Sequence, residues 1–243
     1  MWNKEMPARP VVAVAGATGA VGLEFLEVLH DLDFPASEVR ALASARSAGK
    51  KLAFGGCGDV PAGELTVQEM TPESFEGVDI ALFSCGAEVS KQMRQAVVDA
   101  GAVMIDNSSA FRMDEDVPLV VPEVNPGDLE WHSGVIANPN CSTIQMVVAL
   151  KPLYDLARIK RVVVSTYQAA SGAGAPAMKE LYNQTEEYLS GKEDDQLTVE
   201  AFQHRIAFNC IPHIDKFFED GSTKEEWKMV VETKKIMGDD DIK

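Results

Sequence analysis

Short apolar runs alternate with longer amphipathic segments along most of the chain. Residues 11–15 (VVAVA) form an apolar, β-prone run of strand length, whereas residues 23–32 carry apolar positions at helical spacing. Further strands are expected at 38–43, 51–54, 64–70, 78–84, 102–106, 119–126 (running into a turn), 134–137, 159–170 and 206–211, and further helices at 87–100, 144–156, 176–189 and 224–237. Strands that alternate with helices predict an α/β fold built on a parallel sheet.

A glycine-rich turn, residues 16–22 (GATGAVG), joins the first predicted strand to the first predicted helix. Strand, glycine turn and helix in that order form the context that a dinucleotide fingerprint requires. Gly16 permits the tight turn, and the missing Cβ atoms let a pyrophosphate approach the backbone N–H groups at the helix start. This part of the chain is therefore expected to be a Rossmann-type doubly wound parallel sheet.

A basic, hydroxyl-rich loop follows the second predicted strand. An NAD enzyme places Asp or Glu at this position to hold the ribose hydroxyls, but residues 44–51 (SARSAGKK) contain no acid. Arg46 lies between Ser44 and Ser47, and a guanidinium can give a 2′-phosphate two parallel hydrogen bonds. The loop therefore favours NADP over NAD, and the alternative is a solvated basic loop without a ligand.

The carboxyl ends of two later strands carry further candidate residues, because these ends face the cofactor crevice in a doubly wound sheet. Ser84, Cys85 and Gly86 lie at the end of the strand at 78–84 and are expected to line the crevice, with Cys85 filling space. Arg112 follows the strand at 102–106 in a polar loop on the same side. It is a candidate anion binder, and a surface salt bridge is the alternative.

Cys141 stands between a short strand and a helix, in residues 138–143 (NPNCST). A thiol is a useful nucleophile only as a thiolate, and the unpaired N–H groups of a helix's first turn favour negative charge. Cys141 is therefore a candidate nucleophile, and Pro139 with its polar neighbours indicates a shaped turn. The alternative is a small buried apolar side chain, which a free cysteine commonly is.

The composition narrows the function classes. A chain of 243 residues can form one large or two modest domains, and its formal net charge of −16 opposes binding to nucleic acid or to an anionic membrane. No apolar run reaches membrane-spanning length and the first residues have no signal-peptide core, which predicts a cytoplasmic protein or an organellar form without its leader. Reduced thiols and no metal are expected, because the cysteines are widely spaced and no histidine has metal-ligand spacing: Cys57, Cys85, Cys141 and Cys210.

Six stretches follow one another in order: residues 16–22 (GATGAVG), 44–49 (SARSAG), 117–125 (VPLVVPEVN), 138–145 (NPNCSTIQ), 165–174 (STYQAASGAG) and 225–228 (EEWK). Together they resemble the aspartate-β-semialdehyde dehydrogenase family, in its bacterial-type branch. The resemblance implies an NADP-dependent oxidoreductase that interconverts L-aspartyl 4-phosphate and L-aspartate 4-semialdehyde plus phosphate through a cysteine acyl-thioester. It places this reaction on the route to lysine, threonine and methionine, in a homodimer or homotetramer.

The resemblance also assigns roles to individual residues. Cys141 becomes the nucleophile that forms the thioester, with Asn140 beside the reacting carbonyl. Arg112 and Lys228 fall on the phosphate, and Gln168 and Glu225 fall on the amino-acid part of the substrate, where Gln168 also counts as catalytic. With the strand-end residues above, the expected cofactor contacts are Gly16, Thr18, Gly19, Ala20, Val21, Ser44, Arg46, Ser47, Ser84, Gly86, Ser171 and Gly172.

Two domains are expected: an NADP-binding domain at 1–140 and the first part of an α+β catalytic and dimerisation domain at 141–243. Family members continue into a Cys-Val-Arg stretch, whose Arg holds the substrate carboxylate, and a His-Ser-(Glu/Gln) stretch, whose His is the general base. Neither stretch occurs here, so the chain is expected to be an N-terminal portion of the enzyme. One alternative is N-acetyl-γ-glutamyl-phosphate reductase, which typically has Gly-Cys-Tyr around its cysteine, and another is a non-catalytic NADP-binding module.

Overall fold

The computed structural model describes residues 4–243, which divide into two compact units. The first unit runs to Arg161 and includes Met229–Lys243, and the second is Val162–Lys228. The helices are α1 (Ala20–Asp31), α2 (Ala87–Asp99), α3 (Cys141–Leu156), α4 (Ala175–Leu189) and α5 (Lys224–Met237). Within this described part of the chain, none of them combines the length and the apolar character that crossing a bilayer requires.

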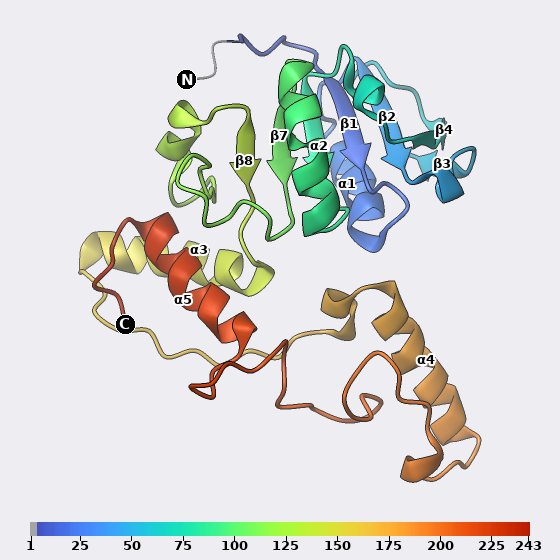
Figure 1. The fold of residues 1–243 in the computed structure, drawn as a ribbon, viewed down its shortest axis with the longest axis vertical. Helices are drawn as coiled ribbons and strands as arrows, with labels where there is room; N and C mark the ends of the chain where they lie inside the picture. The colour runs from blue at the N-terminus through green and yellow to red at the C-terminus, as the bar shows by residue number, and fades with distance from the viewer. Residues whose placement is uncertain (1–3) are drawn as a thin grey trace. The chain divides into compact units, whose positions relative to one another are not determined.

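A six-stranded parallel sheet forms the centre of the first unit (Figure 1). Its strands are β1 (Val11–Ala15), β2 (Glu38–Ala43), β5 (Gln68–Glu69), β6 (Ile80–Phe83), β7 (Val103–Asp106) and β8 (Val135–Ala137). They lie in the order β5-β2-β1-β6-β7-β8, and neighbouring strands pair in parallel. This is the 3-2-1-4-5-6 order of dinucleotide-binding sheets, which confirms the predicted doubly wound fold.

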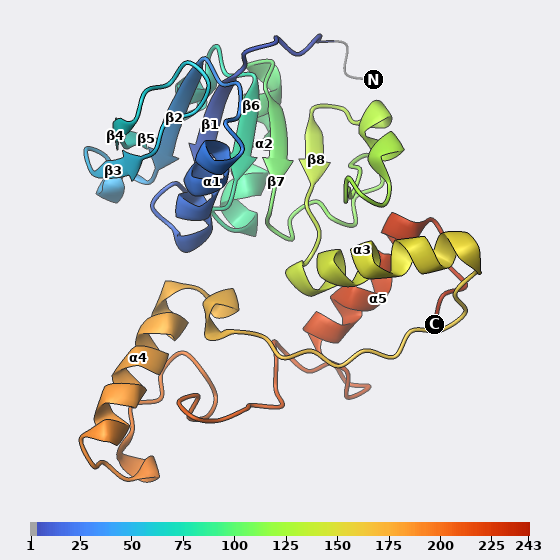
Figure 2. The same ribbon diagram turned by 180° about the vertical axis from the view of Figure 1, so that it is seen from behind.

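Helices cover both faces of this sheet, because the chain winds away from β1 first in one direction and then in the other. The front and back views show α1 on one face and α2 on the opposite face (Figures 1 and 2). Val12 of β1 lies in one core with Leu26 of α1, whereas Ala13 lies in a second core with Val97 of α2. The strand is therefore buried on both sides, which explains why its sequence is apolar throughout.

Two smaller parts complete the first unit. Strands β3 (Lys51–Phe54) and β4 (Gly63–Thr66) pair in antiparallel fashion as a separate ribbon. The chain leaves β8 and enters α3 after three residues, so α3 begins at Cys141, earlier than the expected start at residue 144. The part of α5 from Met229 onward belongs to the same unit.

The second unit is organised by two buried polar side chains of α4. Glu180 and Gln184 are one helical turn apart and are 5% and 0% exposed. Glu180 accepts hydrogen bonds from the backbone N–H groups of residues 200–201, and Gln184 accepts them from residues 206–207. Irregular chain is thus held to one helix by polar bonds, because a buried carboxylate or amide is stable only when it is bonded.

Three predicted strands are wrong. No strand forms within residues 159–170 or 206–211, and residues 119–126 contribute a single bridge, between Leu119 and Ala137. A β-prone segment becomes a strand only where a neighbouring strand supplies partners for its N–H and C=O groups. Residues 162–169 belong to the second unit, Val162–Lys228, in which the structure describes no strand.

Candidate active site

The carboxyl edge of the parallel sheet brings together many of the predicted site residues. Gly16 follows β1, Ser44 follows β2, Ser84 follows β6, Arg112 lies beyond β7 and Cys141 lies beyond β8. These segments are far apart in sequence, but the strands run in one direction, so their carboxyl ends meet at one edge. Ligands of doubly wound sheets bind outside this edge.

The glycine turn is shaped by two positions at which a side chain cannot fit. Gly16 has a φ of +86°, and a Cβ built on it would lie 2.5 Å from the backbone oxygen of Ser84. A Cβ on Gly22 would lie 2.1 Å from the backbone oxygen of Gly16. The turn therefore packs directly against the end of β6, and its glycines leave a cradle of bare backbone at the start of α1.

The first turn of α1 is open to an anion. Gly19 is its N-cap residue and supplies no side-chain hydrogen bond to the helix. Gly19, Ala20 and Val21 are exposed, and Thr18 is half-buried. Unpaired N–H groups at a helix start bind phosphate groups well, so the geometry suits a pyrophosphate.

The loop after β2 presents an exposed guanidinium. Ser44 and Arg46 are exposed, Ser47 is half-buried, and the 3₁₀ turn Ala45–Ser47 is closed by a hydrogen bond from the Ser47 N–H to the Ser44 carbonyl at 2.8 Å. Among residues 4–243, Arg46 has no ion-pair partner within 4.0 Å. Its charge therefore remains available for a ligand.

Cys85 lies two residues beyond the end of β6 and is poorly suited to act as a nucleophile. Burial, helped by the nearby charge of Asp106, raises the pKa of its thiol to about 11. Cys85 therefore stays protonated at neutral pH, and only a thiolate is strongly nucleophilic. Gly86, with a φ of +87°, follows it as the N-cap residue of α2.

Cys141 is the first residue of α3 and is exposed, which excludes the alternative of a buried apolar side chain. Asn140 is the N-cap residue and is 7% exposed. Its side-chain oxygen accepts hydrogen bonds from the N–H groups of Ser142 at 2.9 Å and Thr143 at 3.3 Å. The thiol is thus presented to solvent at the mouth of a helix whose first turn is capped by the preceding residue.

Arg112 is held in a buried position by one carboxylate and by its own loop. Its guanidinium donates to Glu232 Oε1 at 3.0 Å, to the Ser108 carbonyl at 3.0 Å and to the Asn107 carbonyl at 3.1 Å. The residue is 8% exposed, so the expected alternative of a surface salt bridge is replaced by a buried ion pair. These bonds use three of the five N–H groups of a guanidinium, which leaves two for an anion.

A second group of predicted residues lies within the second unit. Gln168 donates to Glu225 Oε1 at 3.1 Å, and Lys228 donates to Glu225 Oε2 at 3.0 Å and to Asp215 Oδ2 at 2.9 Å. Burial opposes the charge of Lys228, but the bonds to Asp215 and Glu225 outweigh it and raise the pKa of the ammonium group. Ser171 and Gly172 are exposed in the 3₁₀ turn Ala170–Ala173 of the same unit.

Sequence reasoning missed Glu232 and Asp215, two of the acidic partners of the predicted cations. Glu232 contacts Arg112 and the backbone of Asn140, and Asp215 contacts Lys228. Asp215 has a φ of +60°, which is uncommon for a residue other than glycine. This backbone conformation is visible only in the structure, so it could not have identified Asp215 from the sequence.

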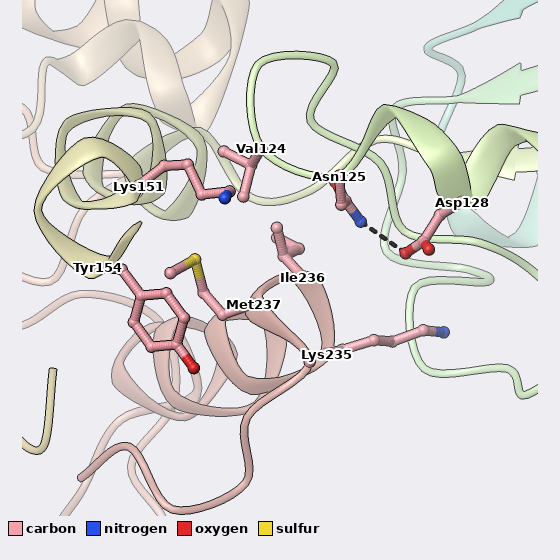
Figure 3. Close-up of a pocket in the computed structure, with 9 residues that line it drawn as sticks. Val124, Asn125, Asp128, Lys151, Tyr154, Lys235, Ile236 and Met237 are labelled. Carbon is pink, nitrogen blue, oxygen red and sulfur yellow. Dashed lines mark hydrogen bonds between the residues drawn. The ribbon is translucent and has the colours of Figure 1, made fainter. Parts of the chain in front are cut away.

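A cavity of about 280 Å³ lies at the other end of α3, between that helix, α5 and the turn at Asn125 (Figure 3). Its polar side chains are already bonded: Asn125 to Asp128, Tyr154 to Asp239, and Lys235 to backbone carbonyls. We assign this cavity no ligand. Within residues 4–243, no cluster of His, Cys, Asp or Glu has the arrangement of a metal site.

Two family models match the chain: the semialdehyde dehydrogenase NAD-binding domain over residues 11–132 and the semialdehyde dehydrogenase dimerisation domain over residues 150–243. The aspartate-semialdehyde dehydrogenase of Aquifex aeolicus (strain VF5) is 58% identical over 235 residues, which cover 96% of this chain and 67% of that protein. That of Bacillus subtilis (strain 168) is 55% identical over 230 residues, which cover 93% of this chain and 65% of that protein.

Solved structures show the same relationship. The crystal structure of aspartate semialdehyde dehydrogenase II from Vibrio cholerae, complexed with ASA, matches with a TM-score of 0.90 and 47% identity, over 97% of this chain and 68% of that one. The Candida albicans aspartate semialdehyde dehydrogenase with NADP matches with a TM-score of 0.64 and 28% identity, over 95% of this chain and 60% of that one. The chain thus spans about two thirds of the length of the proteins it matches.

Proposed function

The chain belongs to the aspartate-semialdehyde dehydrogenase family, and we propose that it contributes the cofactor site and the nucleophile for NADP-dependent interconversion of L-aspartyl 4-phosphate and L-aspartate 4-semialdehyde plus phosphate. This reaction serves the biosynthesis of lysine, threonine and methionine. One observation carries the proposal: the exposed thiol of Cys141 begins a capped helix at the same sheet edge as the glycine cradle.

Cys141 is the residue that changes its bonding in this proposal. Its thiolate attacks the acyl carbon of the acyl phosphate, the C–O bond to phosphate breaks, and the acyl group remains on sulfur as a thioester. The carbonyl oxygen gains negative charge as the C–S bond forms, and in this proposal Asn140, the residue before Cys141, stabilises that charge. In the reverse direction phosphate attacks the thioester and releases the thiolate.

The cofactor part of the proposal rests on the fit of the residues present. A Cβ at Gly16 or Gly22 would collide with backbone oxygens, so the two glycines allow the tight turn, and the first turn of α1 that follows has no side-chain cap. When bound, NADPH would supply a hydride to the acyl carbon, and NADP⁺ would accept one from it in the reverse direction. Arg46, with Ser44 and Ser47, holds the 2′-phosphate and so selects NADP over NAD.

The substrate part rests on paired charges. Arg112 and Lys228 bind the phosphate, and Gln168 and Glu225 bind the amino-acid part of the substrate. Arg112 and Lys228 each form an ion pair with at least one carboxylate, so an incoming phosphate binds to a cation whose charge is already partly neutralised. This arrangement lowers the affinity for phosphate, which has to leave in one direction and enter in the other.

Domain organisation, assembly and location complete the proposal. Residues 1–140 are the NADP-binding domain and residues 141–243 the first part of the catalytic and dimerisation domain, including Ser171 and Gly172 at the cofactor. The match to a dimerisation domain supports a homodimer or homotetramer. The four cysteines are free thiols, which supports a reducing compartment such as the cytoplasm.

The test is acylation of Cys141. The protein is mixed with NADP and either aspartate semialdehyde or its N-acetylglutamate semialdehyde analogue. Mass spectrometry then measures the mass of the peptide that contains Cys141, and absorbance measures the NADPH formed. We expect aspartyl adduct and NADPH from aspartate semialdehyde only, and neither from Cys141→Ala, which still binds NADP. Cys85→Ala is the matched control and retains the adduct.

Three results would contradict the proposal in different ways. If an adduct forms only with the N-acetylglutamate semialdehyde analogue, the result points to N-acetyl-γ-glutamyl-phosphate reductase. Cofactor binding with no adduct at Cys141 points to a non-catalytic NADP-binding module. Adduct that persists in Cys141→Ala removes this residue from the chemistry.

A further inference from the structure

Glu232 connects the anion-binding arginine to the start of the nucleophile helix. Its carboxylate comes from α5 and is 2% exposed. Oε1 accepts a hydrogen bond from Arg112 Nη1 at 3.0 Å, and Oε2 accepts one from the backbone N–H of Asn140 at 2.7 Å. One buried carboxylate therefore contacts both Arg112, the arginine proposed to bind phosphate, and Asn140, the residue that precedes Cys141.

The bond to Asn140 does not serve the helix cap itself. The side chain of Asn140 already accepts from the N–H groups of Ser142 and Thr143 and so caps α3. Glu232 bonds instead to the backbone N–H of Asn140, on the chain that enters the helix. Because peptide groups are planar, this bond fixes the orientation of the peptide between Pro139 and Asn140, and with it the direction in which the chain reaches Cys141.

A second residue of α5 holds the same loop by its main chain. Lys235 donates to the backbone carbonyls of Arg112, Asp114 and Val117 at 2.8, 2.8 and 2.9 Å. The Arg112 loop is thus fixed by its side chain at Glu232 and by its backbone at Lys235. An anion therefore has to bind to a guanidinium that is already oriented and already paired.

We propose that Glu232 is a positioning residue for the reaction, an inference that rests on the proposed function. Its bond to the Asn140 N–H holds the start of α3, and with it the direction in which the Cys141 thiol is presented. Its ion pair offsets the charge of Arg112, which weakens the binding of phosphate and lets it leave after attack by Cys141.

The two contacts can be separated by substitution. In Glu232→Gln the single amide oxygen still accepts from the Asn140 N–H, whereas the amide NH₂ group faces Arg112, so the hydrogen bond to Arg112 and the charge that offsets it are both gone. Phosphate then binds at least about tenfold more tightly, because the negative charge of the carboxylate no longer repels the phosphate a few ångströms away in a buried site. In Glu232→Ala both contacts are lost, and turnover falls by about 100-fold, as small misplacements of reacting groups commonly cause.

The experiment measures phosphate binding through Cys141. The protein is alkylated with iodoacetamide over a series of inorganic phosphate concentrations, and mass spectrometry gives the alkylation rate of the Cys141 peptide. The midpoint of phosphate protection, kcat and the thermal midpoint are compared for the unmodified protein, Glu232→Gln, Glu232→Ala and Asp240→Asn. Asp240 is an exposed carboxylate of the same unit, so its variant controls for the loss of one charge.

The expected result is a phosphate midpoint at least about tenfold lower in Glu232→Gln, a much lower kcat in Glu232→Ala, and no change in either quantity in Asp240→Asn. Glu232→Gln is nearly isosteric and keeps the test valid where the alanine variant unfolds. An unchanged phosphate midpoint in Glu232→Gln, or no phosphate protection at all, overturns the inference. Failure of the proposed function shows differently, as no acyl adduct on Cys141 of the unmodified protein, and leaves the phosphate measurement intact.

Discussion

Replacing Arg46 by Ala tests the cofactor preference most directly. The side chain is exposed in the loop after β2, and within the described residues it makes no ion pair that the substitution would break. The free energy of unfolding should therefore change by less than about 0.5 kcal/mol, as for other surface positions. Any larger effect on binding then reports the ligand and not the fold.

The size of the binding effect follows from the proposed bond. A charge-assisted hydrogen bond contributes about 1.5 to 3 kcal/mol, so the loss of Arg46 should raise the Kd for NADPH by roughly 10- to 150-fold. NADH has no 2′-phosphate, and its Kd should change by less than about threefold. Lys50→Ala is the matched control, because Lys50 is an exposed cation four residues away whose Nζ lies 3.4 Å from Ser47 Oγ.

Titration of each protein with NADPH and NADH, followed by nicotinamide fluorescence, gives the two dissociation constants. An equal loss of affinity for both cofactors in Arg46→Ala would refute the reasoning, because it would mean that the loop shapes the site without contacting the 2′-phosphate. An equally large loss of NADPH affinity in Lys50→Ala would also refute it, since the effect would then be general charge attraction, which salt screens over about 8 Å.

Three further predictions concern packing, thiol chemistry and pH. Gly22→Ala places a Cβ 2.1 Å from the Gly16 oxygen and should lower the free energy of unfolding by about 1 to 3 kcal/mol in denaturant melts. Gly63→Ala, where a Cβ meets nothing within 4 Å, is the neutral control. Equal effects of the two substitutions would contradict the close packing inferred for the glycine turn. Iodoacetamide at about pH 8 should modify the exposed Cys141 and Cys210 but spare Cys85, whose pKa burial raises to about 11; peptide mass spectrometry showing Cys85 labelled as fast would contradict this. The Thr198 N–H, with the Lys192 ammonium and the Thr198 hydroxyl, lowers the pKa of Glu187 to about 2, so its contribution to stability is present above the ordinary carboxyl pKa of about 4.3 and is lost as pH falls towards 2. Unfolding followed by circular dichroism from about pH 5 to pH 2 should therefore depend less on pH in Glu187→Gln, and identical curves would rule the assignment out.

The local pattern of apolar and glycine residues was sufficient to predict the first strand, turn and helix of the central sheet in the first unit. The apolar run at Val11–Ala15, the glycine turn and the helix after it carry their structure in neighbouring residues, because a tight turn at Gly16 needs positive φ and a buried parallel strand needs apolar side chains on both faces. The position of Cys141 at a helix start was readable for the same reason, since Asn140 is a typical N-cap residue.

The predicted strands that did not form show the limit of local pattern. Residues 159–170 have β-prone composition, but a strand is completed by hydrogen bonds to another segment, and composition carries no information about whether that segment is adjacent. The polar organisation of the second unit was missed for a related reason. Glu180 and Gln184 resemble solvent-facing positions of an amphipathic helix until the chain at 198–207 folds over them.

The sequence by itself determined the doubly wound sheet, the dinucleotide turn, the exposed basic loop and the position of Cys141 at a helix start, all of which depend on residues close together in the chain. Only the tertiary structure decided which charges meet. Glu232 lies 92 residues from Asn140 and 120 residues from Arg112, and α5 brings it to both. A buried cation requires a carboxylate nearby, but nothing local to the cation specifies which of the chain's 38 acidic residues will supply it.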